Sequence, residues 1–297
     1  MQFNGFELEE PLPELRRPHV FATLRPWIDV GSVGRLAFRS LERHFEAKDL
    51  GKLSRPGVFF DFTRYRPNIY TMDNQRLVTV PTINVRYAKG PRDNDFVFLH
   101  LLEPHLNGEV YVKCVVKLLE SLNVERYCLI GSMYDLVPHT KPILVTGSTT
   151  SQEVSNLVKE LGVNSSTYEG PTTIVSMISQ ALIKSGVDTM GLVAHLPQYA
   201  QTDVNHAGRL RILKIICELY GFSMDLERIE LRAKQQNSEL TSAMEQSPEV
   251  KNLVEQLEIQ YEKRIRVTED GSMEDEPNLS PDVRDFLDQM GNQFSQN

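Results

Sequence analysis

The chain has 297 residues, of which 40% are hydrophobic and 24% are charged, and its formal net charge is −8. This composition is typical of a globular protein with one large or two moderate domains. No apolar run approaches the ~20 residues of a membrane-spanning helix, so no membrane association is expected. The acidic start of the chain, with Glu7, Glu9 and Glu10, argues against a secretory signal and for a cytoplasmic protein.

Most of the negative charge lies near the C-terminus. Residues 267–297 hold eight acidic side chains and one basic side chain, which predicts an acidic, largely disordered tail. The rest of the chain is close to neutral and lacks the positive field that would attract nucleic acid. Cys114, Cys128 and Cys217 stand alone in apolar patterns, as reduced thiols do, so neither a metal nor a cofactor is expected.

The first hundred residues predict a strand, a helix and several short strands. A strand over residues 21–28 leads into a glycine-bearing turn, and the helix after it carries an apolar side chain at every fourth position from Val33. Short strands, some of them antiparallel, are predicted at 58–62, 77–80 and 83–87. The nearly unbroken apolar run within 95–102 predicts a central strand buried on both faces.

Regular alternation of helices and strands follows. The pattern predicts helices over 110–122, 151–161, 172–185 and 205–220, with strands over 126–131, 143–146 and 190–195. It indicates an α/β fold with a mostly parallel, mixed central sheet covered by helices. Residues 1–20 then form an N-terminal extension, 21–222 the α/β domain, and 223–266 a helical extension broken at Ser247-Pro248 that packs on the body or on a neighbouring subunit.

Three loops rich in glycine, proline or histidine, at 135–142, 168–172 and 195–199, follow or lie close to apolar runs. They are therefore placed at the carboxyl ends of strands, where open α/β sheets usually bind ligands. The candidate acid/base side chains near these ends are Glu103, His139, Glu169 and His195. We favour structural roles for them, since no nucleophile with an adjacent base is evident.

A candidate anion site is formed by Gly31, Ser32 and Gly34, with Gly170 and Thr172 as further members. Backbone N–H groups in a turn between a strand and a helix can hold a phosphate or a carboxylate. The alternative is a tight turn, which we favour because the lysine of a phosphate-binding loop is missing.

Several of these motifs occur together and in a characteristic order. The residues concerned are Gly31-Ser32-Val33-Gly34, Phe60-Asp61-Phe62, Glu103-Pro104, Val137-Pro138-His139-Thr140, Thr146-Gly147-Ser148, Tyr168-Glu169-Gly170-Pro171-Thr172, and Pro197 with Tyr199. In combination they resemble the proteasome assembly chaperone 2 family over about residues 22–266. The resemblance implies a three-layer sandwich of the phosphorylase or hydrolase type, like the fold of purine nucleoside phosphorylases, and it implies self-association. For eukaryotic and archaeal members it implies assistance in assembling proteasome rings.

One departure concerns docking. Archaeal members can end in a hydrophobic-tyrosine-any tripeptide that docks on the proteasome, whereas this sequence ends Ser295-Gln296-Asn297. Two functions remain open at this point. The first is a homo-oligomeric binding or assembly factor, chaperone-like, with a protein client and no definite catalysis. The alternative is a small-molecule hydrolase, transferase or ligase that uses the cleft at the strand ends.

Overall fold

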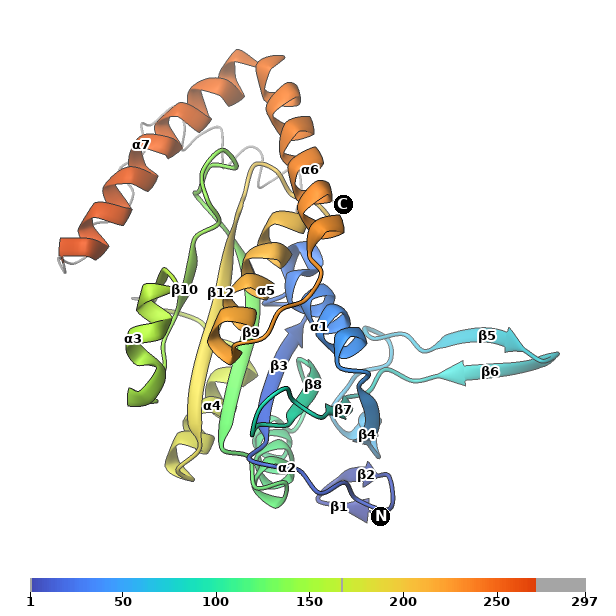
Figure 1. The fold of residues 1–297 in the computed structure, drawn as a ribbon. Coiled ribbons are helices and arrows are strands. Elements are labelled where there is room, and N and C mark those ends of the chain that lie inside the picture. The colour runs from blue at the N-terminus through green and yellow to red at the C-terminus, as the bar shows by residue number, and fades with distance from the viewer. Residues whose placement is uncertain (1, 167, 271–297) are drawn as a thin grey trace.

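The computed structural model describes residues 2–166 and 168–270, and within them a ten-stranded sheet forms the middle of the molecule (Figure 1). Across the sheet the strands follow the order β1 (Gln2–Phe3), β2 (Phe6–Leu8), β4 (Lys48–Leu53), β7 (Asn84–Ala88), β8 (Phe96–Leu102), β3 (His19–Arg25), β9 (Arg126–Asp135), β12 (Asp188–Pro197), β10 (Val145–Gly147) and β11 (Val163–Ser165).

The four central strands β8, β3, β9 and β12 run parallel to one another. His19 is in register with both Phe96 and Arg126, and Arg126 with Asp188, so these strands begin at one level. Their carboxyl ends consequently meet along one end of the sheet, which we call the carboxyl end. The strands from β7 outward to β1 pair antiparallel, as β10 does with β12. The predicted mixed α/β sandwich is confirmed.

Two hydrophobic cores, one on each face of the sheet, are covered by helices. On one face lie α2 (Gly108–Ser121) and α4 (Ile174–Lys184), and on the other α1 (Val33–His44), α3 (Gln152–Glu160) and α5 (His206–Tyr220). Strand β3 shows why both faces are covered. Val20, Ala22 and Leu24 enter the first core and Phe21 the second, because successive side chains of a strand point to opposite faces.

Two further helices, α6 (Glu227–Glu245) and α7 (Pro248–Asp270), follow the α/β body, and the chain breaks between them at Ser247-Pro248 as the sequence predicts. Helix α6 lies against α5 through the buried side chains Ile229 and Ala233, and α7 folds back over the carboxyl end of the sheet (Figure 1). Of the acidic tail expected from residue 267, the part from residue 271 lies outside the described residues.

A two-stranded hairpin, β5 (Asn68–Met72) with β6 (Gln75–Thr79), stands apart from the main sheet and reaches away from the body (Figure 1). The strand predicted at 58–62 was wrong. This segment forms a 3₁₀ turn at Pro56–Val58 followed by further turns, and it buries Phe59 and Phe60 in the first core. Aromatic residues supply apolar area to a core whether or not their backbone is extended, and Pro56-Gly57 starts a turn here.

Candidate functional site

The carboxyl end of the sheet has two halves. The covered half lies at the ends of β9 and β12, under α7, and the open half lies at the ends of β3 and β8 (Figure 1). The predicted site residues are divided between these halves and the α4 side of the sheet.

In the covered half, His195 lies between a carboxylate and a hydroxyl. Its Nδ1 is 2.7 Å from Asp135 Oδ2, and its Nε2 is 2.7 Å from Thr146 Oγ1. An acid, an imidazole and a hydroxyl in this order also form the triad of many hydrolases. Here, however, Thr146 is 7% exposed and His195 is 4% exposed, so a substrate would have no access to the hydroxyl. The hydrogen bonds from Asp135 through His195 to Thr146 therefore join β9, β12 and β10.

His139 is also held by hydroxyl groups. Its Nδ1 is 2.6 Å from the Tyr199 hydroxyl, which also accepts a hydrogen bond of 2.8 Å from the His139 backbone N–H. On the other side of the ring, Nε2 is 3.2 Å from Thr241 Oγ1 of α6. Burial lowers the pKa of His139, which favours the neutral imidazole. The ring thus links the loop after β9, the loop after β12 and helix α6.

Helix α7 covers this half with an apolar contact and a row of polar contacts. Leu253 and Leu257, 1% and 0% exposed, pack against Leu136 and Tyr199. Along the same helix, Glu262 pairs with Lys141 at 2.8 Å, the Tyr261 hydroxyl donates to the Pro142 carbonyl at 3.0 Å, and Glu258 accepts from Thr140.

The last of these contacts is made by Arg264, whose Nη1 donates to Asp135 Oδ2 at 2.8 Å. The Oδ2 atom of Asp135 therefore contacts both Arg264 and His195. Burial alone would raise the pKa of this carboxyl group, but the hydrogen bonds and charges of His195 and Arg264 outweigh burial and hold the pKa well below its usual range. Asp135 remains ionised at neutral pH and connects α7 to the sheet.

The two glutamates of the candidate set lie elsewhere. Glu103 follows β8, and its Oε1 accepts the backbone N–H of Ile174 at 3.1 Å, which caps α4. Its Oε2 is buried and has no hydrogen-bond partner among the residues that the structure describes, and burial raises the pKa of Glu103. Glu169 is exposed in the loop before α4. Among the described residues, no hydrogen bond or ion pair joins either glutamate to His139 or His195, so the four candidates do not share one contact network.

The glycines of the candidate anion site have packing roles. Gly31 has a φ of 57°, and a Cβ on it would lie 2.8 Å from the Cβ of Asn205. A Cβ on Gly34 would lie 2.6 Å from Thr23 Oγ1. The first amides of α1 are already occupied, since Asp29 accepts from the backbone N–H groups of Gly34 and Arg35.

The second part of that candidate site is separate. Gly170 lies against Tyr168, and the hydroxyl of Thr172 contacts that of Ser176 at the start of α4. No contact among the described residues joins Gly170 or Thr172 to the turn at residues 31–34. The structure thus leaves Ser32, rather than the backbone cradle, as the member with a side chain in a cavity.

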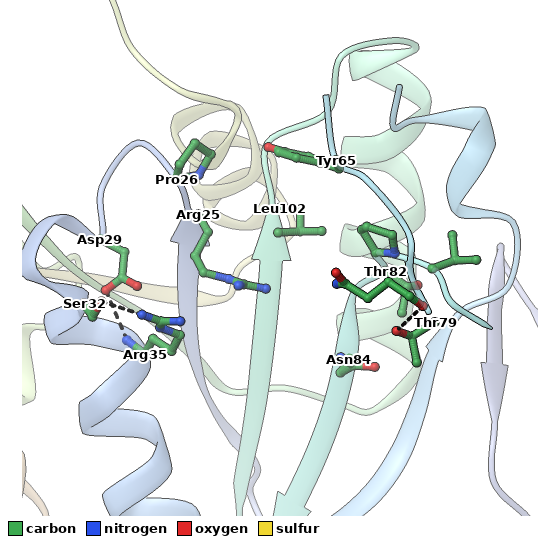
Figure 2. Close-up of a pocket in the computed structure, with 13 residues that line it drawn as sticks. Arg25, Pro26, Asp29, Ser32, Arg35, Tyr65, Thr79, Thr82, Asn84 and Leu102 are labelled. Carbon is green, nitrogen blue, oxygen red and sulfur yellow. Dashed lines mark hydrogen bonds between the residues drawn. The ribbon is translucent and has the colours of Figure 1, made fainter. Parts of the chain in front are cut away.

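That cavity lies in the open half and has a volume of about 500 Å³ (Figure 2). It lies between the end of β3, the start of α1 and the base of the β5–β6 hairpin. Two arginines line it, Arg25 at the end of β3 and Arg35 in the first turn of α1, together with Asp29 and Ser32. The arginines were not predicted from the sequence. Arg25 ends the strand that precedes the glycine turn and Arg35 directly follows the turn, and these positions were the available signal.

Within residues 2–166 and 168–270, no group of three or more histidine, cysteine, aspartate or glutamate side chains is arranged to hold a metal ion. Within those residues, too, none of the helices combines the length and the apolar character needed to cross a bilayer.

Comparison with known proteins places the chain in a family. The model of the PAC2 family matches residues 23–244, which span most of the α/β body and α6. The chain belongs to the PAC2 family. This confirms the resemblance to the proteasome assembly chaperone 2 family that the motifs indicate. No curated protein matches the sequence.

Solved structures share the PAC2 fold at low sequence identity. A Corynebacterium glutamicum protein of unknown function has a TM-score of 0.77 at 21% identity, over 89% of this chain and 98% of that one. A PAC2 family protein from Streptomyces avermitilis gives 0.71 at 24%, over 80% and 99%. A proteasome-assembly chaperone homologue from Mycobacterium tuberculosis gives 0.70 at 22%, over 79% and 99%.

Proposed function

We propose that this PAC2 protein is an oligomeric assembly factor that uses its β5–β6 hairpin to associate with a second copy of the chain. Membership of the PAC2 family and the fold shared with a proteasome-assembly chaperone homologue support an assembly role. The exposed hairpin is the observation that carries the proposal. The cytoplasmic location expected from the sequence stays a prediction.

The hairpin is an incomplete structural unit. Nine of its ten strand residues are exposed, and Ile69 and Val78, which face each other across the two strands, are 57% and 60% exposed. Tyr70 and Met72 add apolar surface on the opposite face. An isolated two-stranded hairpin is marginally stable in water, and an exposed apolar patch marks an interaction surface. A second polypeptide surface would provide the missing cover.

The oligomeric state tests this proposal directly. Size-exclusion chromatography with light scattering should give an oligomer for the wild type and a monomer for the double variant Ile69→Ser/Val78→Ser. The matched control is Leu231→Ser/Ile259→Ser, which removes two exposed apolar side chains from α6 and α7 and should leave the mass unchanged. A monomeric wild type, or an oligomer that survives the hairpin substitutions, contradicts the proposal.

A second experiment addresses the client. The tagged protein and the hairpin variant would be purified from the same lysate, and the retained proteins quantified by mass spectrometry. We expect a specific partner that the wild type retains and the variant loses, and we expect the α6/α7 control to retain it. If the wild type and the hairpin variant retain the same proteins, the hairpin is not needed for binding a client.

One observation favours a second candidate function, hydrolysis or group transfer at Thr146. The order Asp135, His195, Thr146 suits proton removal from the hydroxyl, but α7 would first have to leave the covered half. Hydrolysis of p-nitrophenyl acetate tests it. An enzyme would lose its activity on Thr146→Val and on His195→Ala alike, whereas an assembly factor would show only background rates in all three proteins.

A further inference from the structure

The cavity of the open half has the size of a small-molecule site rather than of an ion site. Its volume of about 500 Å³ lies within the range of typical ligand pockets, roughly 300–1,000 Å³. One wall is formed by the end of β3 and the start of α1. The opposite wall is formed by the hairpin base, where Thr79 and Thr82 lie, and by Asn84 of β7 (Figure 2).

Of the charged side chains that line this cavity, Arg25 has the fewest hydrogen bonds and ion pairs with described residues. Its side chain extends from the end of β3 into the space beside Leu102 (Figure 2), and it is only partly exposed. Among the described residues its guanidinium has no hydrogen bond and no ion pair. Burial lowers the pKa of Arg25, and the nearby charge of Arg35 lowers it further, against the attraction of Asp29. A desolvated charge without a partner destabilises a protein. The N–H donors of Arg25 would therefore be stabilised by binding an anion.

Arg35 adds a second guanidinium on the same side. One of its terminal nitrogens donates to Ser32 Oγ at 2.5 Å, while its Nε is buried and has no hydrogen-bond partner in the described part of the chain. Asp29 is the remaining charged group of the lining, and it is engaged with the amides at the start of α1. The two arginines and Asp29 therefore leave one positive charge uncompensated.

We propose that this cavity binds a small polar organic molecule and that Arg25 and Arg35 hold its oxyanion group, a carboxylate or a phosphate. Guanidinium groups bind both groups through paired N–H donors. The cavity is larger than either group alone requires. Asn68 and Asn84 offer side-chain amides with no protein hydrogen bond in the described part of the chain, which suit a body that carries hydroxyl groups.

Three hexose compounds that differ at one carbon test the proposal. Glucose 6-phosphate carries a phosphate, glucuronate a carboxylate and glucose neither, and each would be added at constant ionic strength in a phosphate-free buffer. We expect at least one of the two anions to raise the thermal midpoint saturably, by about 3 °C at ten times its Kd, and glucose to leave it unchanged. The responding anion identifies the oxyanion. If neither anion shifts the midpoint more than glucose does, the proposal is overturned.

Arg25→Met supplies the matched variant, and Arg43→Met, at the exposed far end of α1, supplies the control. We expect the anion shift to be lost in Arg25→Met and kept in Arg43→Met. Without any ligand, Arg25→Met should raise the midpoint by about 1–3 °C, because it removes an uncompensated charge. An anion shift that persists in Arg25→Met, or a lower ligand-free midpoint for this variant, would assign Arg25 a structural role and overturn the proposal.

Discussion

The covered and open halves of the carboxyl end are built from neighbouring parallel strands, yet they differ in how their charged side chains are paired. In the covered half Asp135 is paired with both His195 and Arg264, and α7 lies over them. In the open half the guanidinium of Arg25 has no partner among the described residues, and a cavity separates it from the hairpin base. The covered half therefore contributes stability, while the open half retains binding capacity.

Imidazole is a common catalytic group, so His139 and His195 are candidates for catalysis by residue type. In this PAC2 protein, however, they join loops beneath a helix. Arg25 and Arg35, in contrast, line a cavity.

The largest effect is expected from Asp135→Ala. This substitution leaves Arg264 and the buried His195 without their shared acceptor, and the loss of one member of a buried pair typically costs about 3–5 kcal/mol. Urea unfolding would measure the free energy of unfolding. Glu169→Ala, which removes an exposed carboxylate that has no partner among the described residues, is the control and should change stability by less than about 0.5 kcal/mol. Equal effects of the two substitutions would refute a stabilising role for the covered half.

Leu257→Ala should destabilise the contact of α7 with the strand-end loops by about 3 kcal/mol, as expected for a fully buried leucine. Hydrogen exchange across residues 248–265 should rise in this variant more than exchange in the central strands. Ile259→Ala changes an apolar side chain of the same helix that is 58% exposed, and it should leave exchange unchanged. Uniform acceleration over the whole chain would mean that α7 does not open as a separate unit.

A matched pair of arginine substitutions compares the two halves directly. Arg264→Met should lower the free energy of unfolding by about 2 kcal/mol, because Asp135 loses a charged hydrogen bond of 2.8 Å. Arg25→Met should change the free energy of unfolding in the opposite direction, since that guanidinium has no partner to lose within residues 2–166 and 168–270. Thermal and urea unfolding of both variants would show the signs. The same sign for both would remove the distinction between the halves.

The smallest expected effect is on pH dependence. The folded-state pKa of Asp135 lies below its unfolded value. The contribution of Asp135 to the free energy of unfolding is therefore complete above pH 5 and decreases as pH falls through about 4. At pH 4 the loss from this one group should be about 0.4 kcal/mol, since the unfolded carboxyl group is then about half protonated. Urea unfolding of the wild type and of Asp135→Asn at pH 6 and pH 4 would isolate the contribution of this carboxyl group. If the wild type loses no more free energy of unfolding between the two pH values than the variant does, Asp135 is not stabilised as a paired carboxylate.

The order of helices and central strands was predictable because their apolar patterns are strong. Strands with weak patterns were missed. Four of the six residues of β4, Lys48–Leu53, are charged or glycine, and Asn68–Met72 and Val163–Ser165 are short or fully exposed. Their place is determined by pairing with distant residues, such as β4 with β2 and β7, and not by local propensity.

The candidate site was predictable in its location but not in its partners. Histidines in strand-end loops were expected at the carboxyl end, and His139 and His195 lie there. What no local pattern indicates is that Arg264 returns to Asp135 and that Thr241 reaches His139. Likewise, a glycine turn suggested a backbone cradle, but Asp29 occupies the amides and the accessible charge belongs to Arg25.

The strand order also has a consequence for synthesis on the ribosome. Strand β3 is hydrogen-bonded to β8 and β9, both of which emerge much later, and the contacts of α7 with the loop after β9 need residues 253–264. Pairings so distant along the chain form slowly and leave apolar strands uncovered while translation continues. A nascent chain stopped before α7 would therefore expose Leu136 and Tyr199, and chaperone capture of such truncated chains should end once α7 has emerged.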